Sequence, residues 1–344
     1  MRGVIQIGPE QEGVQAALMS SLGRVQRRFA EQLRTDLPAV NELCEHVERY
    51  HGKMLRPILV LLSGLAAHPE GAGGAPESLL SEDHITMAAV CEMVHMATLV
   101  HDDVLDEAEV RRRGRTLNAL RGNEAAVLLG DYLIASAYHL CSQLQSQEHA
   151  LAIGQVSRVL CAGELLQIDH REDWSLDEAT YFQILERKTA SLIAVSCERG
   201  ALISGATREA ARALATYGRR LGVAFQIQDD LLDLTGEVGT VGKSVGKDIE
   251  KGKLTLPLIL HLATADQRER AETIRLIQGA SRPDSDSARA GLADRLLASG
   301  SLARAHNTAL DLVAEAKGAL AELPETPARG VLERMAEAAV DRAA

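Results

Sequence analysis

The pattern of apolar and polar residues predicts helices along most of the chain. Ile85–His101 is an almost continuous apolar run typical of a buried helix, and Leu221–Gln228 is a shorter run of the same kind. Leu302–Ala319 has apolar residues at the spacing of an amphipathic helix, for which core packing is the simplest interpretation. Alternating β-branched runs, the usual signal of strands, are nearly absent. The pattern therefore predicts an all-α protein.

Two short polar segments interrupt this pattern. His68–Pro76 is rich in Gly, Ser281–Ala290 is rich in Ser and Asp, and both are predicted to be loops. The length of 344 residues would allow about two domains, but neither loop resembles a linker that divides the chain. We therefore expect a flexible N-terminus, residues 1–15, followed by a single all-helical domain, residues 16–344. Ten or more helices would form a bundle around a central cavity.

Composition and charge narrow the function. The chain is 46% hydrophobic, enough for a large core, and rich in helix formers such as Ala, Leu, Glu and Arg. The net charge of −11 argues against a nucleic-acid partner, which usually meets a basic face. An anionic substrate is still compatible with this charge, because bound divalent cations can reverse the local sign.

Cysteines and apolar stretches bear on the compartment. The five cysteines include no C-x-x-C pair, so they are expected to be buried, reduced thiols of a cytoplasmic protein. The N-terminal residues lack the apolar core of a signal peptide. The longest apolar stretches, around Ala88–Val100 and Leu254–Ala265, are too short to span a bilayer. We therefore expect a soluble, cytoplasmic protein.

A D-D-x-x-D motif occurs twice, each time at the end of an apolar helical run. The six aspartates are Asp102, Asp103, Asp106, Asp229, Asp230 and Asp233. The first and last of each motif, at i and i+4, stack on one helix face and repel each other, near a helix C-terminus that disfavours anions. Mg²⁺ would remove this repulsion and suits dense oxygen ligands. A solvated acidic helix end is the structural alternative, but two copies favour a magnesium site that also binds a phosphate compound.

Basic residues around these motifs could bind phosphate groups. They are Lys53 and Arg56, Arg111, Arg112 and Arg113, Lys188 beside Thr189, and Lys243, Lys247 and Lys253 in a segment of Gly-Lys pairs. Taken singly, each is more typical of a solvated surface. The Gly-Lys pairs do not form a P-loop, and only their position around the aspartate motifs favours a role in a site.

Together these motifs resemble the trans-isoprenyl (polyprenyl) diphosphate synthase family, over most of the chain from about Gly52 onward. The resemblance rests on seven motifs: G-K-x-x-R-P (Gly52–Pro57), H-x-A-T-L-V-H-D-D-V-x-D (His95–Asp106), G-N-E-A-A-V-L-L-G-D-Y-L (Gly122–Leu133), G-E-x-x-Q (Gly163–Gln167), K-T-A (Lys188–Ala190), F-Q-I-x-D-D-x-L-D (Phe225–Asp233) and G-K-x-x-G-K-D-x-x-x-G-K-x-T-L-P (Gly242–Pro257). It implies the all-helical isoprenoid-synthase fold and a prenyltransferase activity.

The resemblance also assigns roles by position. The six aspartates would hold Mg²⁺, three ions per active site, on an allylic diphosphate, and Asp102, Asp103, Asp106 and Asp229 would be catalytic. Arg111, Lys188, Gln226 and Lys243 would assist at that diphosphate. Lys53, Arg56, His95 and Arg112 would bind isopentenyl diphosphate. Lys188, Thr189 and Lys253 would act at the reaction centre.

The implied reaction is a head-to-tail condensation of isopentenyl diphosphate with an allylic diphosphate, giving an all-trans polyprenyl diphosphate. The family is usually homodimeric, and a lipid-like product suggests transient membrane contact at release. Two details depart from the family pattern. Three arginines replace the usual two, so the functional pair is either Arg111/Arg112 or Arg112/Arg113, and His51 stands where a Gly is usual.

Product length would depend on the helix face before the first motif. His95, Thr98 and Asp102 share one face, and in this family a bulky aromatic four or five positions before the first Asp stops growth early. Here these positions hold Thr98 and Ala97, which favours a long product, C30–C50, for a quinone side chain. Small residues also suit helix packing, so a farnesyl or geranylgeranyl diphosphate synthase is one alternative. A class I terpene cyclase and a silent subunit of a heteromeric synthase are the others, disfavoured by the second intact motif.

Overall fold

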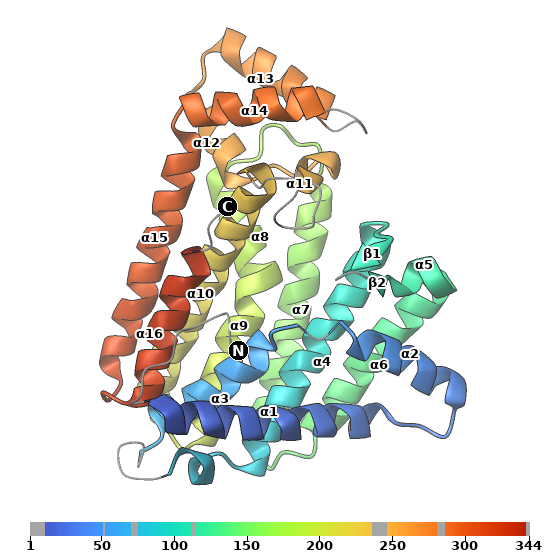
Figure 1. Ribbon diagram of the computed structural model, residues 1–344, viewed down its shortest axis with the longest axis vertical. Helices are drawn as coiled ribbons and strands as arrows, with labels where there is room; N and C mark the ends of the chain where they lie inside the picture. The colour runs from blue at the N-terminus through green and yellow to red at the C-terminus, as the bar shows by residue number, and fades with distance from the viewer. Residues whose placement is uncertain are drawn as a thin grey trace. The chain divides into compact units, whose positions relative to one another are not determined.

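The computed structural model describes residues 11–50, 52–69, 75–111, 114–235, 246–280 and 286–341, and these are almost entirely α-helical, as Figure 1 shows. The predicted all-α class is confirmed. Contacts group the chain into two compact units: unit 1 is Met1–Arg158, Leu192–Gly218 and Ala319–Arg334, and unit 2 is Val159–Ser191, Arg219–Gly318 and Met335–Ala344.

Unit 1 contains most of the N-terminal helices. They are α1 (Glu12–Leu33), α2 (Pro38–Glu48), α3 (Leu55–Ala67), α4 (Glu82–Leu105), α5 (Leu117–Arg121), α6 (Asn123–Cys141) and α9 (Ser191–Ile203), with the 3-10 turns η2 (Pro76–Leu79) and η4 (Leu320–Glu322). Strands β1 (Val110–Arg111) and β2 (Gly114–Arg115) form a small antiparallel pair in which Val110 lies opposite Arg115. The unit boundary falls within α7 (Gln147–Asp169), α10 (Arg208–Thr235) and α16 (Pro327–Val340).

Helix α4 is the centre of unit 1. It packs beside α3 and α6, and α1 runs across these helices (Figure 1). Ser81 and His84 form a capping box at its N-terminus, where two acidic residues, Glu82 and Asp83, also favour the positive end of the helix dipole. Most of its side chains are buried, which explains the near-continuous apolar run. The predicted helix Ile85–His101 is therefore confirmed within a longer helix.

Unit 2 holds the C-terminal helices. They are α8 (Glu178–Leu185), α11 (Lys247–Glu250), α12 (Leu256–Thr264), α13 (Gln267–Ala280), α14 (Asp286–Ala298) and α15 (Ser301–Ala319), and a π-helical turn, η3 (Glu186–Ala190), follows α8. Helices α13 and α14 pack against each other as a pair (Figure 1). The predicted helices Leu221–Gln228 and Leu302–Ala319 are confirmed as parts of α10 and α15.

Three expectations change in detail. Residues 286–290 of the predicted loop Ser281–Ala290 form the first turn of α14, because Ala288, Arg289 and Ala290 are good helix formers. Four cysteines are buried as expected, but Cys161 is exposed on α7. Residues 1–10 of the predicted flexible N-terminus lie outside the described residues, and residues 12–15 already belong to α1.

One described helix, α7, has the length and apolar composition that could cross a membrane, and 28% of its most apolar window is buried. A single helix of this length and composition is weak evidence for a membrane span.

Candidate active site

The first aspartate motif forms the C-terminal turn of α4 in unit 1. Asp102 and Asp106 are half-buried, whereas Asp103 is only 2% exposed. The helix ends in a Schellman motif: the Ala108 amide donates to the Asp103 carbonyl at 2.9 Å, and the Glu107 amide donates to the Val104 carbonyl at 3.2 Å. The predicted position of this motif at a helix end is confirmed.

Arg111 reaches back from β1 to this turn. Its Nη2 donates to Asp103 Oδ1 at 2.7 Å, and its Nε lies 2.9 Å and 3.0 Å from the two carboxylate oxygens. The ion pair compensates the burial of the Asp103 carboxylate, which would otherwise be costly. Arg112 and Arg113 lie outside the described residues.

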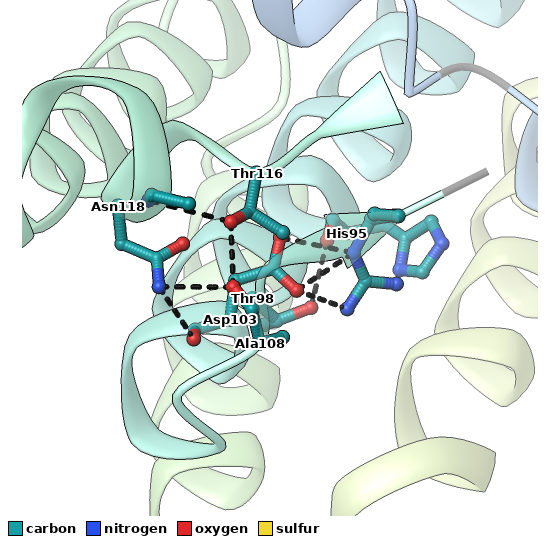
Figure 2. Close-up of polar contacts among 8 residues, drawn as sticks. His95, Thr98, Asp103, Ala108, Thr116 and Asn118 are labelled. Carbon is teal, nitrogen blue, oxygen red and sulfur yellow. Dashed lines mark hydrogen bonds and ion pairs between the residues drawn. The ribbon is translucent and has the colours of Figure 1, made fainter. Parts of the chain in front are cut away.

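The helix face that precedes the motif carries three predicted residues. His95 and Thr98 are half-buried like Asp102, and the Thr98 hydroxyl donates to the His95 carbonyl at 2.7 Å (Figure 2). Ala97 is fully buried, at 0% exposure. Thr98 rather than Ala97 therefore shares the partly exposed face of α4 with the aspartates.

Lys53 and Arg56 come from the start of α3. Lys53 is exposed in the loop before the helix, and Arg56 is half-buried in its first turn. Met54, between them, has a φ of 51° and caps the helix in the left-handed conformation. His51, the departure from the family pattern, lies outside the described residues.

The second aspartate motif lies on α10, within unit 2. Asp230 is 5% exposed. The Tyr181 hydroxyl donates to its Oδ2 at 2.7 Å, and Gln226 Nε2 donates to its Oδ1 at 3.0 Å. Burial, and then the charge of Asp248, raise the pKa of Asp230 well above its ordinary value. Asp230 is therefore held largely by hydrogen bonds to neutral groups.

The outer aspartates of this motif are more open. Asp229 and Asp233 are half-buried. Asp233 also anchors the segment that returns toward it, since its Oδ2 accepts from the Asp248 amide at 3.1 Å and its carbonyl accepts from the Gly246 amide at 2.8 Å. The aspartates that are half-buried in each motif are thus its first and last, the pair stacked at i and i+4.

The π-helical turn η3 carries Lys188 and Thr189. Lys188 forms an ion pair with Glu164 of α7, and the Thr189 hydroxyl lies 3.3 Å from Gln226 Oε1. A Cβ at Gly163 would lie 2.7 Å from the Lys188 amide nitrogen, so glycine is required where α7 meets this turn. These contacts account for the Gly and Glu of the G-E-x-x-Q motif.

A cavity of about 110 Å³ in unit 2 brings several predicted residues together. It is lined by Gln167, His170, Leu176, Tyr181, Ile184, Leu185, Lys188, Thr189, Gln226, Asp230, Asp248, Lys253, Leu254 and Thr255. Five of these residues were expected at the site from the sequence: Lys188, Thr189, Gln226, Asp230 and Lys253. Lys243 lies outside the described residues.

Sequence reasoning missed several residues that hold the site residues in place. Tyr181 belongs to no quoted motif, and only its contact with Asp230 reveals it. Asp248 is the aspartate of the motif Gly242–Pro257, but it had no assigned role until its amide was found to donate to Asp233. Glu164 was part of a quoted motif without an assigned role. Asn118 and Thr116, which contact the turn after α4, carry no signal in the sequence pattern.

The carboxylates match the oxygen ligands that Mg²⁺ prefers. Among the described residues, no three His, Cys, Asp or Glu side chains lie close enough together to hold a metal ion by themselves. Mg²⁺ is usually bound by one or two carboxylates, with waters and substrate phosphates completing its shell. Each of the half-buried pairs, Asp102/Asp106 in unit 1 and Asp229/Asp233 in unit 2, provides that number and kind of ligand, so each pair by itself fits an ion that binds together with a diphosphate.

Comparison with known proteins identifies the family. A family model described as polyprenyl synthetase matches residues 37–292. The chain belongs to the polyprenyl synthetase family. Octaprenyl diphosphate synthase of Escherichia coli (strain K12), a relative, is 33% identical over 333 residues, which cover 96% of this chain and 98% of that enzyme.

Solved structures of polyprenyl synthetase relatives share the fold. A polyprenyl synthase from Caulobacter crescentus CB15, complexed with calcium and isoprenyl diphosphate, is 34% identical, with a TM-score of 0.85 over 98% of this chain and 99% of that one. A decaprenyl diphosphate synthase from Rhodobacter capsulatus is 34% identical, with a TM-score of 0.86 over 97% and 99%. The predicted family is therefore confirmed.

Proposed function

We propose that this polyprenyl synthetase condenses isopentenyl diphosphate with an allylic diphosphate in the presence of Mg²⁺ and makes a long, all-trans polyprenyl diphosphate. The observation that carries the proposal is the repetition of one arrangement. Each D-D-x-x-D motif lies at or near the end of a long helix, with its middle aspartate buried and bonded and its outer pair half-buried. The octaprenyl and decaprenyl names of the relatives support the product class.

Different side chains would bind the metal ions and the two diphosphates. Asp102, Asp106, Asp229 and Asp233 would hold Mg²⁺, with Asp103 and Asp230 as the further members of the predicted set. Bound Mg²⁺ supplies charge that stabilises a departing diphosphate, and the calcium in the Caulobacter complex supports a divalent cation here. Arg111, Lys188, Gln226 and Lys243 would assist at the allylic diphosphate, and Lys253 would act at the reaction centre. The isopentenyl diphosphate would be bound by Lys53, Arg56, His95 and Arg112.

The remaining steps follow from substrate chemistry and exclusion of water. As the allylic carbon–oxygen bond breaks, the double bond of isopentenyl diphosphate attacks the allylic cation, and the departed diphosphate accepts the proton that is lost. The side chains of Thr189 and Gln226 would keep the reacting groups in position beside Lys188. The Thr189 hydroxyl lies 3.3 Å from Gln226 Oε1. Apolar side chains that line the same cavity, Leu176, Ile184, Leu185 and Leu254, would exclude water from the cation.

The test is turnover of the purified protein with Mg²⁺, isopentenyl diphosphate and, in turn, geranyl, farnesyl and geranylgeranyl diphosphate. Products of C30 or longer support the proposal. A product that stops at C15 or C20 keeps the chemistry and overturns the long-chain assignment. No product with any primer would overturn the synthase assignment and favour a cyclase or a subunit that needs a partner.

We also propose that the active form is a homodimer in the cytoplasm, with transient membrane contact when the product leaves. Large apolar side chains are exposed on α6 and α7 of unit 1, with Leu128 68% exposed and Leu151 64% exposed. In a homodimer, a second copy of the chain would cover these side chains. Light scattering should give a dimer for the wild type and a monomer for Leu128→Lys. The matched control is Leu297→Lys, on α14, where the side chain is 69% exposed. A monomeric wild type would overturn the proposal.

A further inference from the structure

We propose that Asn118 and Thr116 are positioning residues that hold the first aspartate motif in its binding geometry by clamping the turn at the end of α4. This inference rests on the proposed function and extends it to two residues that none of the predicted roles include. Both residues belong to the start of α5, where Thr116 is the N-cap, and both lie beside the end of α4 in Figure 2.

The turn that they contact is strained. Glu107 follows Asp106 directly and has a φ of 47°, the left-handed conformation that glycine usually supplies at this position of a Schellman motif. Two carboxylates at i and i+4, Asp102 and Asp106, add like-charge repulsion near the negative end of the helix dipole. Backbone strain at Glu107 and repulsion between Asp102 and Asp106 therefore both favour fraying of the turn that would bind Mg²⁺.

Asn118 bridges the two ends of this turn with one amide group. Its Nδ2 donates to the Asp103 carbonyl at 3.2 Å and to the Ala108 carbonyl at 3.1 Å (Figure 2). The Ala108 amide already donates to the Asp103 carbonyl, so the Asn118 amide adds a second link between Asp103 and Ala108, on either side of the turn. An asparagine amide has two N–H groups, one for each carbonyl.

Thr116 adds a second bond at the same place. Its hydroxyl donates to the Ala108 carbonyl at 2.5 Å and accepts from the Ala119 amide at 3.4 Å as the cap of α5. Thr116 is fully buried, which strengthens the hydrogen bond and makes its loss costly. Asn118 and Thr116 thus fix the backbone of the turn, while Arg111 fixes the Asp103 side chain.

Asn118 and Thr116 therefore position the turn, whereas the aspartates bind the cation. The hydrogen bonds that Asn118 and Thr116 donate go to backbone carbonyls, so they do not compete with a cation at the carboxylates of Asp102 and Asp106. Through these carbonyls, both residues position the turn that carries Asp106 relative to Asp102. Partners that orient metal ligands typically contribute about 10- to 100-fold to metal affinity when they are removed. Loss of these hydrogen bonds is therefore expected to weaken the binding of Mg²⁺ with diphosphate while the protein stays folded.

The experiment measures binding of inorganic pyrophosphate in the presence of MgCl₂ by calorimetry, together with the Mg²⁺ concentration that gives half-maximal turnover. Asn118→Ala and Thr116→Val remove the donors, and Thr116→Ser keeps the hydroxyl. The matched control is Asn41→Ala, because Asn41 Nδ2 also donates to a backbone carbonyl, that of Thr35 at 2.9 Å, in the loop before α2. Circular dichroism establishes that each variant is folded.

We expect Asn118→Ala and Thr116→Val to raise the dissociation constant of pyrophosphate and the Mg²⁺ concentration for half-maximal turnover about tenfold each. In Thr116→Ser and Asn41→Ala, both quantities should stay within about twofold of the wild type. If Asn118→Ala does not fold, the comparison of Thr116→Val with Thr116→Ser still tests the positioning role. Wild-type binding and Mg²⁺ dependence in Thr116→Val or in a folded Asn118→Ala would overturn the clamp. Absence of turnover in the wild type would instead overturn the proposed function, and pyrophosphate binding would still test the clamp.

Discussion

The guanidinium group of Arg111 holds the carboxylate of Asp103 from two nitrogens, with Nη2 2.7 Å and Nε 2.9 Å from Oδ1. Asp230, the corresponding aspartate of the second motif, is held instead by Tyr181 and Gln226. The two motifs therefore bury the same position by different means, one with a charged partner and one with neutral donors. We expect these middle aspartates to orient the motifs and the outer aspartates to dominate cation binding.

Tyr181→Phe tests this role of the buried carboxyl in unit 2. Loss of the hydroxyl leaves Asp230 Oδ2 without its 2.7 Å donor, which is expected to cost about 1–3 kcal/mol in the free energy of unfolding and to lower turnover. Tyr217→Phe is the matched control, because the Tyr217 hydroxyl is also buried and donates at 2.7 Å, but to the Leu332 carbonyl. Urea unfolding and turnover are measured for both variants. Equal turnover in the two variants would contradict a role of Tyr181 in the site.

Product length is expected to respond at Thr98. Its side chain is half-buried on the face that carries Asp102, whereas Ala97 is fully enclosed. Thr98→Phe should therefore shorten the product by several isoprene units with little loss of stability, and the isosteric Thr98→Val should leave it unchanged. Ala97→Phe is expected to destabilise the fold by about 1–3 kcal/mol or more, because it overfills a packed position. An unchanged chain-length profile for folded Thr98→Phe would exclude this face as the wall of the product groove.

The elements and motifs that the sequence predicted depend on local pattern. A helix such as α4 is readable because its apolar positions are contiguous, and the D-D-x-x-D motifs are readable because like charges at i and i+4 are unfavourable without a ligand. The π-helical turn at Lys188 was not predictable, since it arises where Gly163 of α7 approaches the backbone. The same holds for Tyr181 and Asn118, whose partners are 49 and 15 residues away in the chain.

Gly130 of α6 is expected to be indispensable for the position of His101, the residue before Asp102. A Cβ at Gly130 would lie 2.1 Å from His101 Nε2, and this nitrogen now lies 3.2 Å from the Val127 carbonyl. Gly130→Ala should therefore displace the imidazole, cost about 1–3 kcal/mol in the free energy of unfolding and raise the Mg²⁺ requirement. Gly154→Ala on α7 is the control, because open space surrounds that position and alanine favours a helix by up to about 1 kcal/mol. Equal stability of the two variants would show that α6 can shift away from His101.

Stability should fall in mild acid because of His84. Burial, as the largest effect, lowers the pKa of His84 from 6.5 to about 4, and its Nε2 lies 2.9 Å from Ser204 Oγ and 3.1 Å from the Gly200 carbonyl. Between these pH values the unfolded chain binds a proton that the folded chain does not, so the free energy of unfolding decreases as the pH falls from about 6.5 toward 4. The full effect of this one group is about 3 kcal/mol. Nearby His68 and His149 add positive charge that acts in the same direction.

His84→Gln isolates this contribution, because glutamine does not titrate. The variant is expected to be less stable than the wild type at pH 7, where the capping box and the contacts with Ser204 and Gly200 are lost or weakened, but to lose less stability between pH 7 and pH 4.5. Urea unfolding at the two pH values measures the difference, with Asn41→Ala as a variant that lowers stability without removing a titrating group. If His84→Gln lost as much stability on acidification as the wild type, the acid sensitivity would have to come from other groups, with His149 and His261, whose pKa values burial also lowers, the next to test.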